Sequence, residues 1–480
     1  MNIAFTKPYY NVATEANTTA LEEAYNVYFE AMPQGGFAVR KRPGYTLVES
    51  VSGRAQGIYW SDRKRALYFV VGSNLYEKTS PDTAATLIGS VGNSVAPTIF
   101  AEGQKVDLEL ILYTATGGQV RYTDLTTGTV VTPDPMPQAT FITNMNNRFY
   151  ANDQSASDQD FWITDFNPDP AVMVNDPTYW ASSNNPFRAA QKPDALLGVF
   201  SAFNEVYMWG SQGCEIWQED GVTPISPLVG SIIEAGLSAP YSVVMSNNTF
   251  FALGTVSGKR CVLMLNGRAP KIVSEAIANK LQAIDYVKDA IGSLCFVGGT
   301  NFYVLTFPSA KQTWAYDFKT DTWSQWSEWD STTATHIAFN GKFGIYAKDW
   351  NRHYVLGANG GLYELSRSVY SDNGTPIRSS VRTGWIDHGS WDRKRCEQLI
   401  IKCKGYLDND ALLLMRTRDD GRPEWSNYTE FNLKAGEQNE SLIMLNRMGI
   451  YRSRQFEFIM TDANNLALLG LEIDVTKMRF

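Results

Sequence analysis

A hairpin phrase recurs seven times between residues 65 and 366, and it constrains the fold more than any other feature of the chain. Each copy has an apolar or aromatic strand, a turn rich in Gly, Asn, Asp or Lys, and a second strand ending near an aromatic residue. Successive copies begin about 40 to 55 residues apart, which is the period of a four-stranded β-propeller blade. The copies begin at Arg65, Leu108, Asn147, Asn204, Asn248, Asn301 and Phe343.

The repeats predict an all-β protein with a propeller of about six to eight blades over residues 46–376. The alternative is a run of unrelated hairpins in two sandwiches. Residues 1–45 are expected to form an N-terminal arm. A Gly-, Pro- and Ser-rich break runs from Ser368 to Ser380, and longer alternating strands follow it. These strands predict a C-terminal β-sandwich-like domain over residues 377–480.

Two segments carry helical signals. Residues 274–290 begin at a good N-cap serine and predict a helical insertion packed on the propeller rim. Residues 19–32 have a Thr–Glu capping box, but their aromatic and β-branched residues equally suit an extended arm, and both readings stay open. Apolar residues recur at helical spacing in the insertion at Ile277, Leu281, Ile284 and Val287.

Composition narrows the class of protein. The formal net charge is -8, whereas a domain that grips nucleic-acid phosphates is normally strongly basic. The N-terminal residues lack the pattern of a secretory signal, and no apolar run approaches the roughly 20 residues that a membrane helix needs. We therefore expect a soluble protein folded in the cytoplasm. Five widely spaced cysteines favour reduced, buried thiols over a disulfide framework: Cys214, Cys261, Cys295, Cys396 and Cys403.

No catalytic, cofactor-binding or metal-binding residue is predicted. The three histidines lack partners at metal spacing, and the gaps between His388, Cys396 and Cys403 match no common zinc pattern. The segment from Arg416 to Trp425 resembles an Asp-box of propeller glycosidases with one residue inserted, but a single imperfect copy outside the propeller favours a plain hairpin turn. A glycosidase would need carboxylates that converge in space. Candidates are Asp62, Asp165, Glu215 and Asp317.

Three basic runs and two tryptophans are candidate interface residues. The runs are either solvated turns or contacts with an acidic partner or subunit. In the stretch TWAYDFKTDTWSQWSEWD, Trp314 and Trp323 fit a blade hairpin. The next two tryptophans, Trp326 and Trp329, follow at a spacing of three residues, which matches neither face of a strand. At least one of these two is expected at the surface. The candidates are Arg40, Lys41, Arg42, Arg63, Lys64, Arg65, Arg393, Lys394, Arg395, Trp326 and Trp329.

Several phrases in order resemble one known family. They include Asn26-x-Tyr28-x-Glu30, then RPGY, RAQGIYW and LYFVVGSNLYEK. Further on come FWITD from Phe161 to Asp165, Pro193-Asp194, and EIW from Glu215 to Trp217. The C-terminal phrases WDRKRCEQLIIKCKG and ALLGLEIDV fit the final domain of the same family. Together they are similar to the tail hub, or nozzle, proteins of short-tailed bacteriophages, also called packaged-DNA stabilisation proteins.

The resemblance implies a structural virion protein rather than an enzyme. It implies a homohexameric ring in the tail, below the portal and its adaptor ring, assembled in the host cytoplasm without a membrane anchor or cofactor. Such a ring closes the DNA channel, retains the packaged DNA and conducts it on ejection without sequence-specific binding. It also docks tail fibres, tailspikes or a needle. The alternatives are a propeller glycosidase or depolymerase and a receptor-binding propeller.

Overall fold

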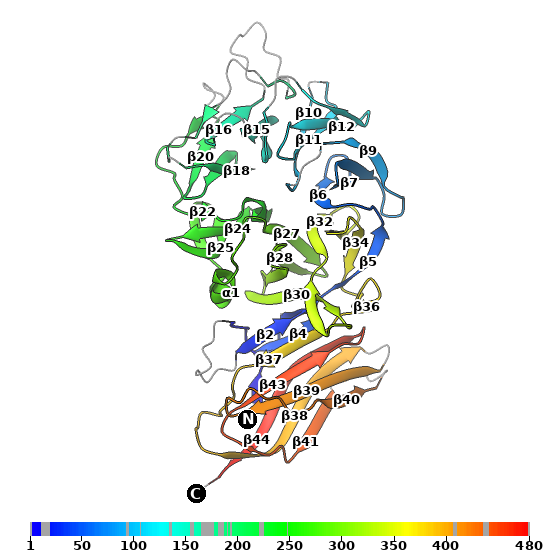
Figure 1. Cartoon of the computed structure of the whole chain (residues 1–480), viewed down its shortest axis with the longest axis vertical. Coiled ribbons are helices and arrows are strands. Elements are labelled where there is room, and N and C mark those ends of the chain that lie inside the picture. Colours follow the sequence, from blue (N-terminus) through cyan, green and yellow to red (C-terminus); the bar gives the residue numbers. More distant parts are fainter. Residues whose placement is uncertain are drawn as a thin grey trace.

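The computed structural model describes residues 2–10, 20–92, 96–105, 107–133, 137–153, 158–164, 177–180, 187–189, 191–192, 194–219, 225–246, 248–406, 410–434 and 441–478. Almost all regular structure within these residues is β-strand. Figure 1 shows a ring of small sheets with a β-sandwich attached to one side of it. The first and last described strands, β1 and β44, pair with each other in the sandwich.

Six sheets of the ring are built from consecutive strands. Blades 1 and 2 contain β6 (Ala55–Ser61), β7 (Ala66–Val71), β8 (Asn74–Lys78) and β9 (Thr86–Ser90), then β10 (Ile99–Gln104), β11 (Leu110–Ala115), β12 (Arg121–Asp124) and β13 (Thr129–Val131). Blades 3 and 4 contain β14 (Ile142–Met145), β15 (Arg148–Asn152), β16 (Asp160–Ile163) and β17 (Phe187–Arg188), then β18 (Leu196–Ala202), β19 (Glu205–Gly210), β20 (Cys214–Gln218) and β21 (Ser226–Pro227). Blade 5 contains β22 (Gly236–Leu237), β23 (Val244–Ser246), β24 (Thr249–Val256), β25 (Lys259–Asn266) and β26 (Ala269–Ile272). Blade 6 contains β27 (Ile291–Val297), β28 (Thr300–Phe307), β29 (Gln312–Asp317) and β30 (Thr322–Asp330), and β31 (Thr335–Ala338) pairs with the end of β30.

A seventh sheet closes the ring with strands from both ends of the propeller segment. Its consecutive strands are β32 (Gly341–Ala347), β33 (Arg352–Gly357) and β34 (Leu362–Ser366), and its fourth strand is β5 (Gly44–Glu49). The short strands β35 (Ser371–Asp372) and β36 (Thr375–Pro376) extend this sheet. Pairing β5 with β34 ties the two ends of the ring together, so the predicted all-β propeller of six to eight blades is confirmed.

Hydrophobic packing between blades follows the same ring. A separate buried cluster fills each of the seven seams between neighbouring blades. In the seam between blades 1 and 2, for example, Tyr68 and Val70 meet Leu112 and Leu125. Strands buried on both faces explain why the first strands of the repeats read as apolar runs rather than as simple alternation.

Local backbone chemistry explains the turns and the tight centre of the ring. Asn146 and Asn147 join β14 to β15 with φ of 51° and 64°, the left-handed conformation that a two-residue hairpin turn requires and that asparagine tolerates. Inner strands carry glycines where a neighbour comes close. A Cβ on Gly292 of β27 would lie 2.1 Å from the backbone oxygen of Ser242, so only glycine fits there.

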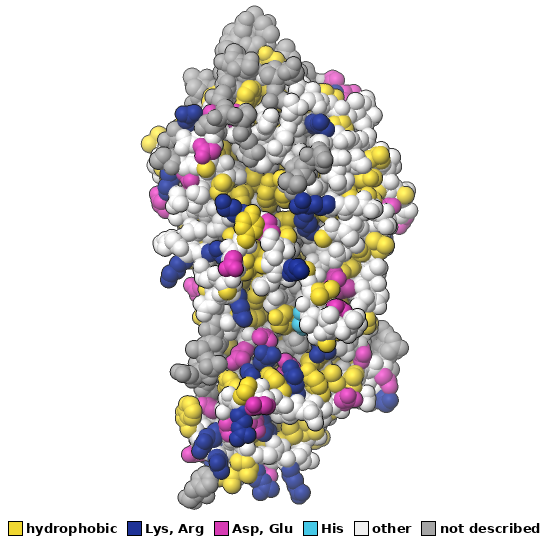
Figure 2. Space-filling model, viewed as in Figure 1, with side chains coloured by type: hydrophobic (Ala, Val, Ile, Leu, Met, Phe, Trp, Pro, Cys, Tyr) yellow, Lys and Arg dark blue, Asp and Glu magenta, His cyan; other side chains and the backbone are white. Residues whose placement is uncertain are grey.

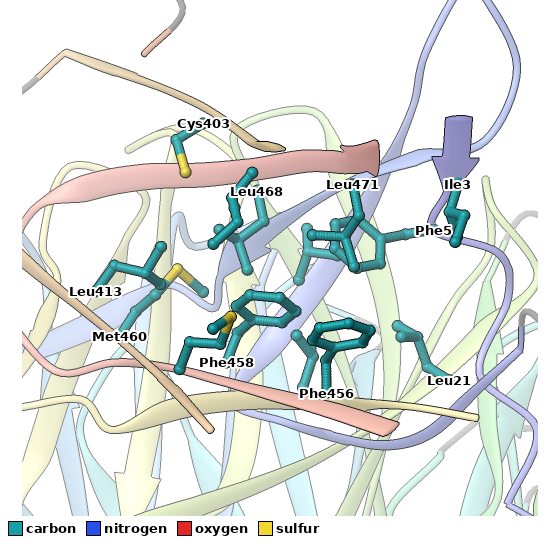
Figure 3. Packing of buried hydrophobic residues seen from close by; sticks show 14 of the residues in the cluster. Ile3, Phe5, Leu21, Cys403, Leu413, Phe456, Phe458, Met460, Leu468 and Leu471 are labelled. Carbon is teal, nitrogen blue, oxygen red and sulfur yellow. The ribbon is translucent and has the colours of Figure 1, made fainter. Parts of the chain in front are cut away.

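The sandwich is made of two sheets that share a buried core (Figure 3). One sheet holds β3 (Val27–Ala31), β4 (Phe37–Lys41), β44 (Asn465–Lys477), β38 (Lys394–Tyr406) and β41 (Ser441–Asn446), with β1 (Asn2–Ala4) and β42 (Ile450–Tyr451) at its sides. The other holds β2 (Leu21–Tyr25), β37 (Ser379–Thr383), β43 (Arg454–Met460), β39 (Ala411–Asp419) and β40 (Thr429–Leu433). Phe456 and Phe458 of β43 lie between the sheets and face Leu468 and Leu471 of β44.

The N-terminal residues correct the expected arm. Strands β1 to β4 belong to the two sheets of the sandwich, and β5 belongs to the propeller, so the described residues 2–10 and 20–45 do not form a separate unit. The open choice for residues 19–32 is resolved in favour of extended chain over the described residues 20–32. Asn26 has a φ of 56° and separates β2 from β3, which interrupts any helix. Burial of Leu21, Ala24 and Val27 in the sandwich core overrides the helical capping signal.

The predicted helical insertion is shorter than expected. It contains the 3-10 turn η3 (Glu275–Ile277) and the helix α1 (Ala278–Gln282), and the remaining residues to 290 are irregular. The Arg260 guanidinium donates to the carbonyls of Leu281 (2.8 Å) and Ile284 (2.6 Å) and so occupies acceptors at the end of the helix. The four apolar residues of the pattern are all buried, so the spacing predicted burial correctly but not helix length. A second 3-10 turn, η2, spans Pro240–Ser242.

Candidate functional site: the propeller–sandwich junction

One continuous sheet joins the propeller to the sandwich. Strand β2 pairs in parallel with β30 of blade 6 at Tyr25 and Gln325, and its other edge pairs with β37 of the sandwich. The strand order therefore runs from blade 6 through β2 into the sandwich without a break. A shared sheet limits rotation between the two parts, because rotation would break backbone hydrogen bonds.

Arg42 is the most heavily bonded side chain at this junction. It is fully buried, and its guanidinium holds the two carboxylate oxygens of Asp372 at 2.9 and 2.5 Å. The remaining N–H groups donate to Asn26 Oδ1 (2.9 Å) and to the backbone oxygens of Pro43 and Ser327 (3.0 Å each). All five guanidinium donors are thus satisfied, which is the condition for burying an arginine. The charge also lies 4.9 Å from the centre of the Phe339 ring.

Asn26 connects four segments around that arginine. Its side-chain oxygen accepts from Arg42 and from the Ser327 backbone N–H (2.8 Å), and its amide donates to the Arg378 carbonyl (2.8 Å). Its backbone oxygen accepts from the Ser379 hydroxyl at 2.9 Å. The junction is therefore a satisfied polar network in a buried position, which fixes one arrangement of its parts.

A second network lies beside the first. Glu30 accepts from Arg40 Nε at 2.6 Å and from Arg367 at 2.9 Å, and Arg367 also donates to the Tyr28 hydroxyl at 2.6 Å. Partial burial alone would raise the pKa of Glu30, but the hydrogen bonds from both arginines lower it. Arg367 belongs to the chain after blade 7 and Glu30 to the sandwich, so this pair also joins the two parts.

Lys41 is buried next to these networks. Its side chain is enclosed by the sandwich, and its ammonium donates to the backbone oxygen of Asp462. Burial lowers the pKa of Lys41 to about 7, against the opposing attraction of Asp462. Of the first basic run, only Arg40 remains partly exposed.

The tryptophan stretch has a simple geometric explanation. Residues three apart in a strand point to opposite faces, so Trp323 and Trp326 of β30 lie on the two sides of blade 6. Trp323 packs in the seam with blade 5, and Trp326 packs in the seam with blade 7. Trp329 is half-buried beyond the blade, 4.2 Å from the Arg378 guanidinium and 4.9 Å from the His336 ring. Burial and the nearby Arg378 charge lower the pKa of His336 to about 4, so the histidine is neutral.

The structure brings together Arg40, Lys41, Arg42, Trp326 and Trp329 at the junction, but not the other two basic runs. The prediction of an interface contact is corrected for four residues, because their side chains are buried within the chain: Lys41, Arg42, Lys394 and Trp326. The sequence could not reveal this, since Arg42 is enclosed by Asp372, which is 330 residues away.

The other basic residues stay candidate contacts. Arg65 is 76% exposed on the turn between β6 and β7 and lies 3.4 Å from Asp349. Lys64 donates to the Leu125 carbonyl at 2.9 Å, and Arg63 is exposed on the same turn. Arg393 and Arg395 are exposed beside the buried Lys394 at the start of β38. Figure 2 shows cationic and anionic side chains interspersed on the visible face of the sandwich.

The candidate carboxylates do not converge within the described part of the chain. Asp62 lies in blade 1, Glu215 in blade 4 and Asp317 in blade 6, and Asp165 lies outside the described residues. Glu215 accepts from the Lys192 N–H at 2.7 Å, and Asp317 accepts from the Lys319 N–H at 2.8 Å within its own turn. These two carboxylates therefore have structural partners.

The Asp-box-like turn and the His/Cys cluster also have structural roles. Trp425 lies 4.7 Å from the guanidinium groups of both Arg416 and Arg418, as expected when a hairpin tryptophan packs back on its sheet. The His388 ring hydrogen-bonds the Tyr451 hydroxyl at 2.9 Å. Among the residues that the structure describes, no group of three or more His, Cys, Asp or Glu side chains could hold a metal ion. None of the described helices has the length and apolarity to cross a membrane.

Comparison with known proteins gives one strong match. A family model described as "Bacteriophage P22 Gp10, beta-propeller" matches residues 17–369. No curated protein matches the chain.

The solved structures give only distant likenesses. The extracellular domain of a hybrid two component system from B. thetaiotaomicron is 8% identical with a TM-score of 0.43, and the match covers 71% of this chain and 46% of that one. Thus the chain spans less than half the length of that protein. An exo-β-1,3-galactanase from Phanerochaete chrysosporium has 8% identity, a TM-score of 0.30 and coverage of 91% and 100%. Dihydro-heme d1 dehydrogenase NirN has 11% identity, a TM-score of 0.39 and coverage of 86% and 79%. Because all three TM-scores lie below 0.5, these likenesses carry no argument about this chain.

Proposed function

The chain belongs to the bacteriophage P22 Gp10 β-propeller family, a structural family of phage tail and stabilisation proteins, and from this we propose that it is the tail hub of a short-tailed phage. In this role, copies of the chain form a homohexameric ring below the portal and its adaptor. The ring closes the DNA channel, retains the packaged genome, conducts it on ejection and docks tail fibres, tailspikes or a needle. The family match over residues 17–369 is the observation that carries the proposal.

The charge of the chain supports a conduit. The net charge is -8, and on the face of the sandwich visible in Figure 2 cations are interspersed with carboxylates. Each phosphate contact by Lys or Arg adds to affinity, so a strongly basic wall would hold DNA during ejection. A channel wall without a strong positive charge lets the duplex pass without sequence-specific binding.

The junction supports a mechanical role. DNA under pressure in a closed particle pushes on the ring, and a flexible link between propeller and sandwich would let the ring deform. The shared sheet and the buried Arg42–Asp372 pair instead couple the propeller to the sandwich. Pairing of β5 with β34 likewise closes the ring of blades, because it joins the two ends of the propeller segment within blade 7.

An apolar sheet edge supports a contact between copies. Strand β41, with the sequence SLIMLN, is at the edge of its sheet, and Leu442 and Met444 are 51% and 58% exposed. Isolated proteins usually protect such an edge with charge or proline, and β41 has neither. We place a contact with a second copy of the chain here, together with the exposed Arg63, Arg65, Arg393 and Arg395 as candidate contacts with acidic partners.

A conditional mutation that stops synthesis of the chain tests the retention role. Without the chain, heads are expected to package DNA and then lose it, so nuclease-protected DNA per particle falls and is restored by a wild-type copy supplied in trans. Particles that keep their DNA and assemble complete tails without the chain would contradict the proposal. Hydrolysis of host polysaccharide by the purified chain would instead favour the glycosidase, and binding of the purified chain to host cells would favour the receptor-binding propeller.

A further inference from the structure

A small cavity lies in the seam between blades 6 and 7, next to the Trp326 and Phe339 rings that pack on Arg42. Ser293 and Cys295 of β27 and Trp326 of β30 line it from blade 6, while Gly344 of β32 and His353 of β33 line it from blade 7. It leaves about 10 Å3 for the centre of a water-sized sphere, which is close to the space of a single water molecule.

Buried polar atoms line this cavity without protein partners. His353 is 2% exposed, and neither of its ring nitrogens has a hydrogen-bond partner among the described residues. The indole N–H of Trp326 is likewise buried and unpaired within that part of the chain. Burial lowers the pKa of His353 to about 3, so its ring is neutral, with one nitrogen as donor and the other as acceptor. Buried polar groups of native proteins almost always have partners, and ordered water is the usual one when protein supplies none.

Gly344 shows that two of the polar groups point to one place. A Cβ on this glycine would lie 3.1 Å from His353 Nε2 and 3.4 Å from Ser293 Oγ. The φ of Gly344 is not in the left-handed region, so the backbone conformation does not demand glycine there. The missing side chain instead leaves room in front of the imidazole and the hydroxyl.

We propose that this cavity is a binding site for one water molecule, which bridges His353 of blade 7 and Ser293 of blade 6 by hydrogen bonds. Trp326 also lines the cavity, and its buried N–H has no partner among the described residues. The site joins two blades whose seam also holds a buried cluster of apolar and aromatic side chains. Since Trp326 also lies 5.9 Å from the Arg42 guanidinium, the water site borders a side chain that packs against the junction.

A high-resolution structure of the wild-type chain tests the proposal without any variant. Density for a water is expected at hydrogen-bond distance, about 2.7 to 3.2 Å, from both His353 Nε2 and Ser293 Oγ. An empty cavity in a map that resolves other buried waters would overturn the proposal.

Two variants test which groups hold the water. His353→Leu makes the blade 7 side of the cavity apolar, and Gly344→Ala puts a methyl group in the water's place, so the density should disappear in both. Gly118→Ala is a matched control, since a Cβ there has nothing within 4 Å and the seam density should persist. Unchanged density in His353→Leu would show that the histidine does not hold the water.

Discussion

Substituting Arg42 by methionine removes the cation from the buried pair at the junction while keeping most of the side-chain volume. Asp372 is then left as a buried carboxylate without its bidentate partner, and Asn26 and the Ser327 carbonyl each lose a donor. Removing one partner of a buried ion pair costs about 3–5 kcal/mol, because the remaining charge stays desolvated. We expect a loss of this size in the free energy of unfolding, measured by urea denaturation with tryptophan fluorescence. Trp326, whose ring lies 5.9 Å from the guanidinium, contributes to this signal together with the other tryptophans of the chain.

Two further variants define what would refute this reasoning. Arg65→Met is the matched control, because Arg65 is exposed and its surface ion pair should contribute only about 0–1 kcal/mol. Replacing both partners, Arg42→Met with Asp372→Leu, leaves no buried charge and should cost clearly less than Arg42→Met alone. If Arg42→Met were as stable as Arg65→Met, the buried pair would not hold the junction.

Three further predictions concern pH, packing and thiols. The folded-state pKa of Lys41 is lowered to about 7, so the unfolded state binds more protons than the folded state between pH 7 and 10.5. The free energy of unfolding, relative to that of Lys41→Met, should therefore rise with pH in that window by at most about 5 kcal/mol. A pH-independent difference between the two proteins in urea denaturation would exclude a perturbed Lys41. Gly292→Ala puts a Cβ 2.1 Å from the Ser242 oxygen and should cost at least about 3 kcal/mol or prevent folding, whereas Gly118→Ala should stay within about 0.5 kcal/mol in the same assay. All five cysteines are buried and unpaired with one another, and burial raises the pKa of Cys403 to about 12. Iodoacetamide should therefore modify the cysteines only in denaturant. Rapid labelling of the native protein, read by mass spectrometry, would contradict their burial.

Much of the propeller could be predicted from the sequence because its determinants are local. Several hairpin turns contain residues with a positive φ, and Asn147 and Asn351 supply them within the repeats themselves. The first strands are apolar because both faces of every blade are buried. The pairing partner of the closing strand β5 could not be predicted from local sequence, because β5 pairs with β34 from the opposite end of the propeller segment.

The junction could not be predicted, because its partners are brought together only by the complete fold. Arg42 stands in a basic run that looks like a solvated turn, and nothing nearby in the sequence indicates Asp372. A polar Asn26 between two strands that each carry buried apolar residues was the available signal, since asparagine tolerates the left-handed conformation that it adopts here. The Trp326 spacing was informative too: three residues apart in a strand means opposite faces, and hence two different seams.

Cryo-EM reconstruction of the virion that carries this chain is the most direct test of the central claim. We predict that propeller density with the attached sandwich lies in the tail below the portal, in a closed ring around the DNA channel, and that the Arg42 junction keeps the same arrangement in every copy. Density for the chain away from the channel, or absence of the chain from purified virions, would contradict the account.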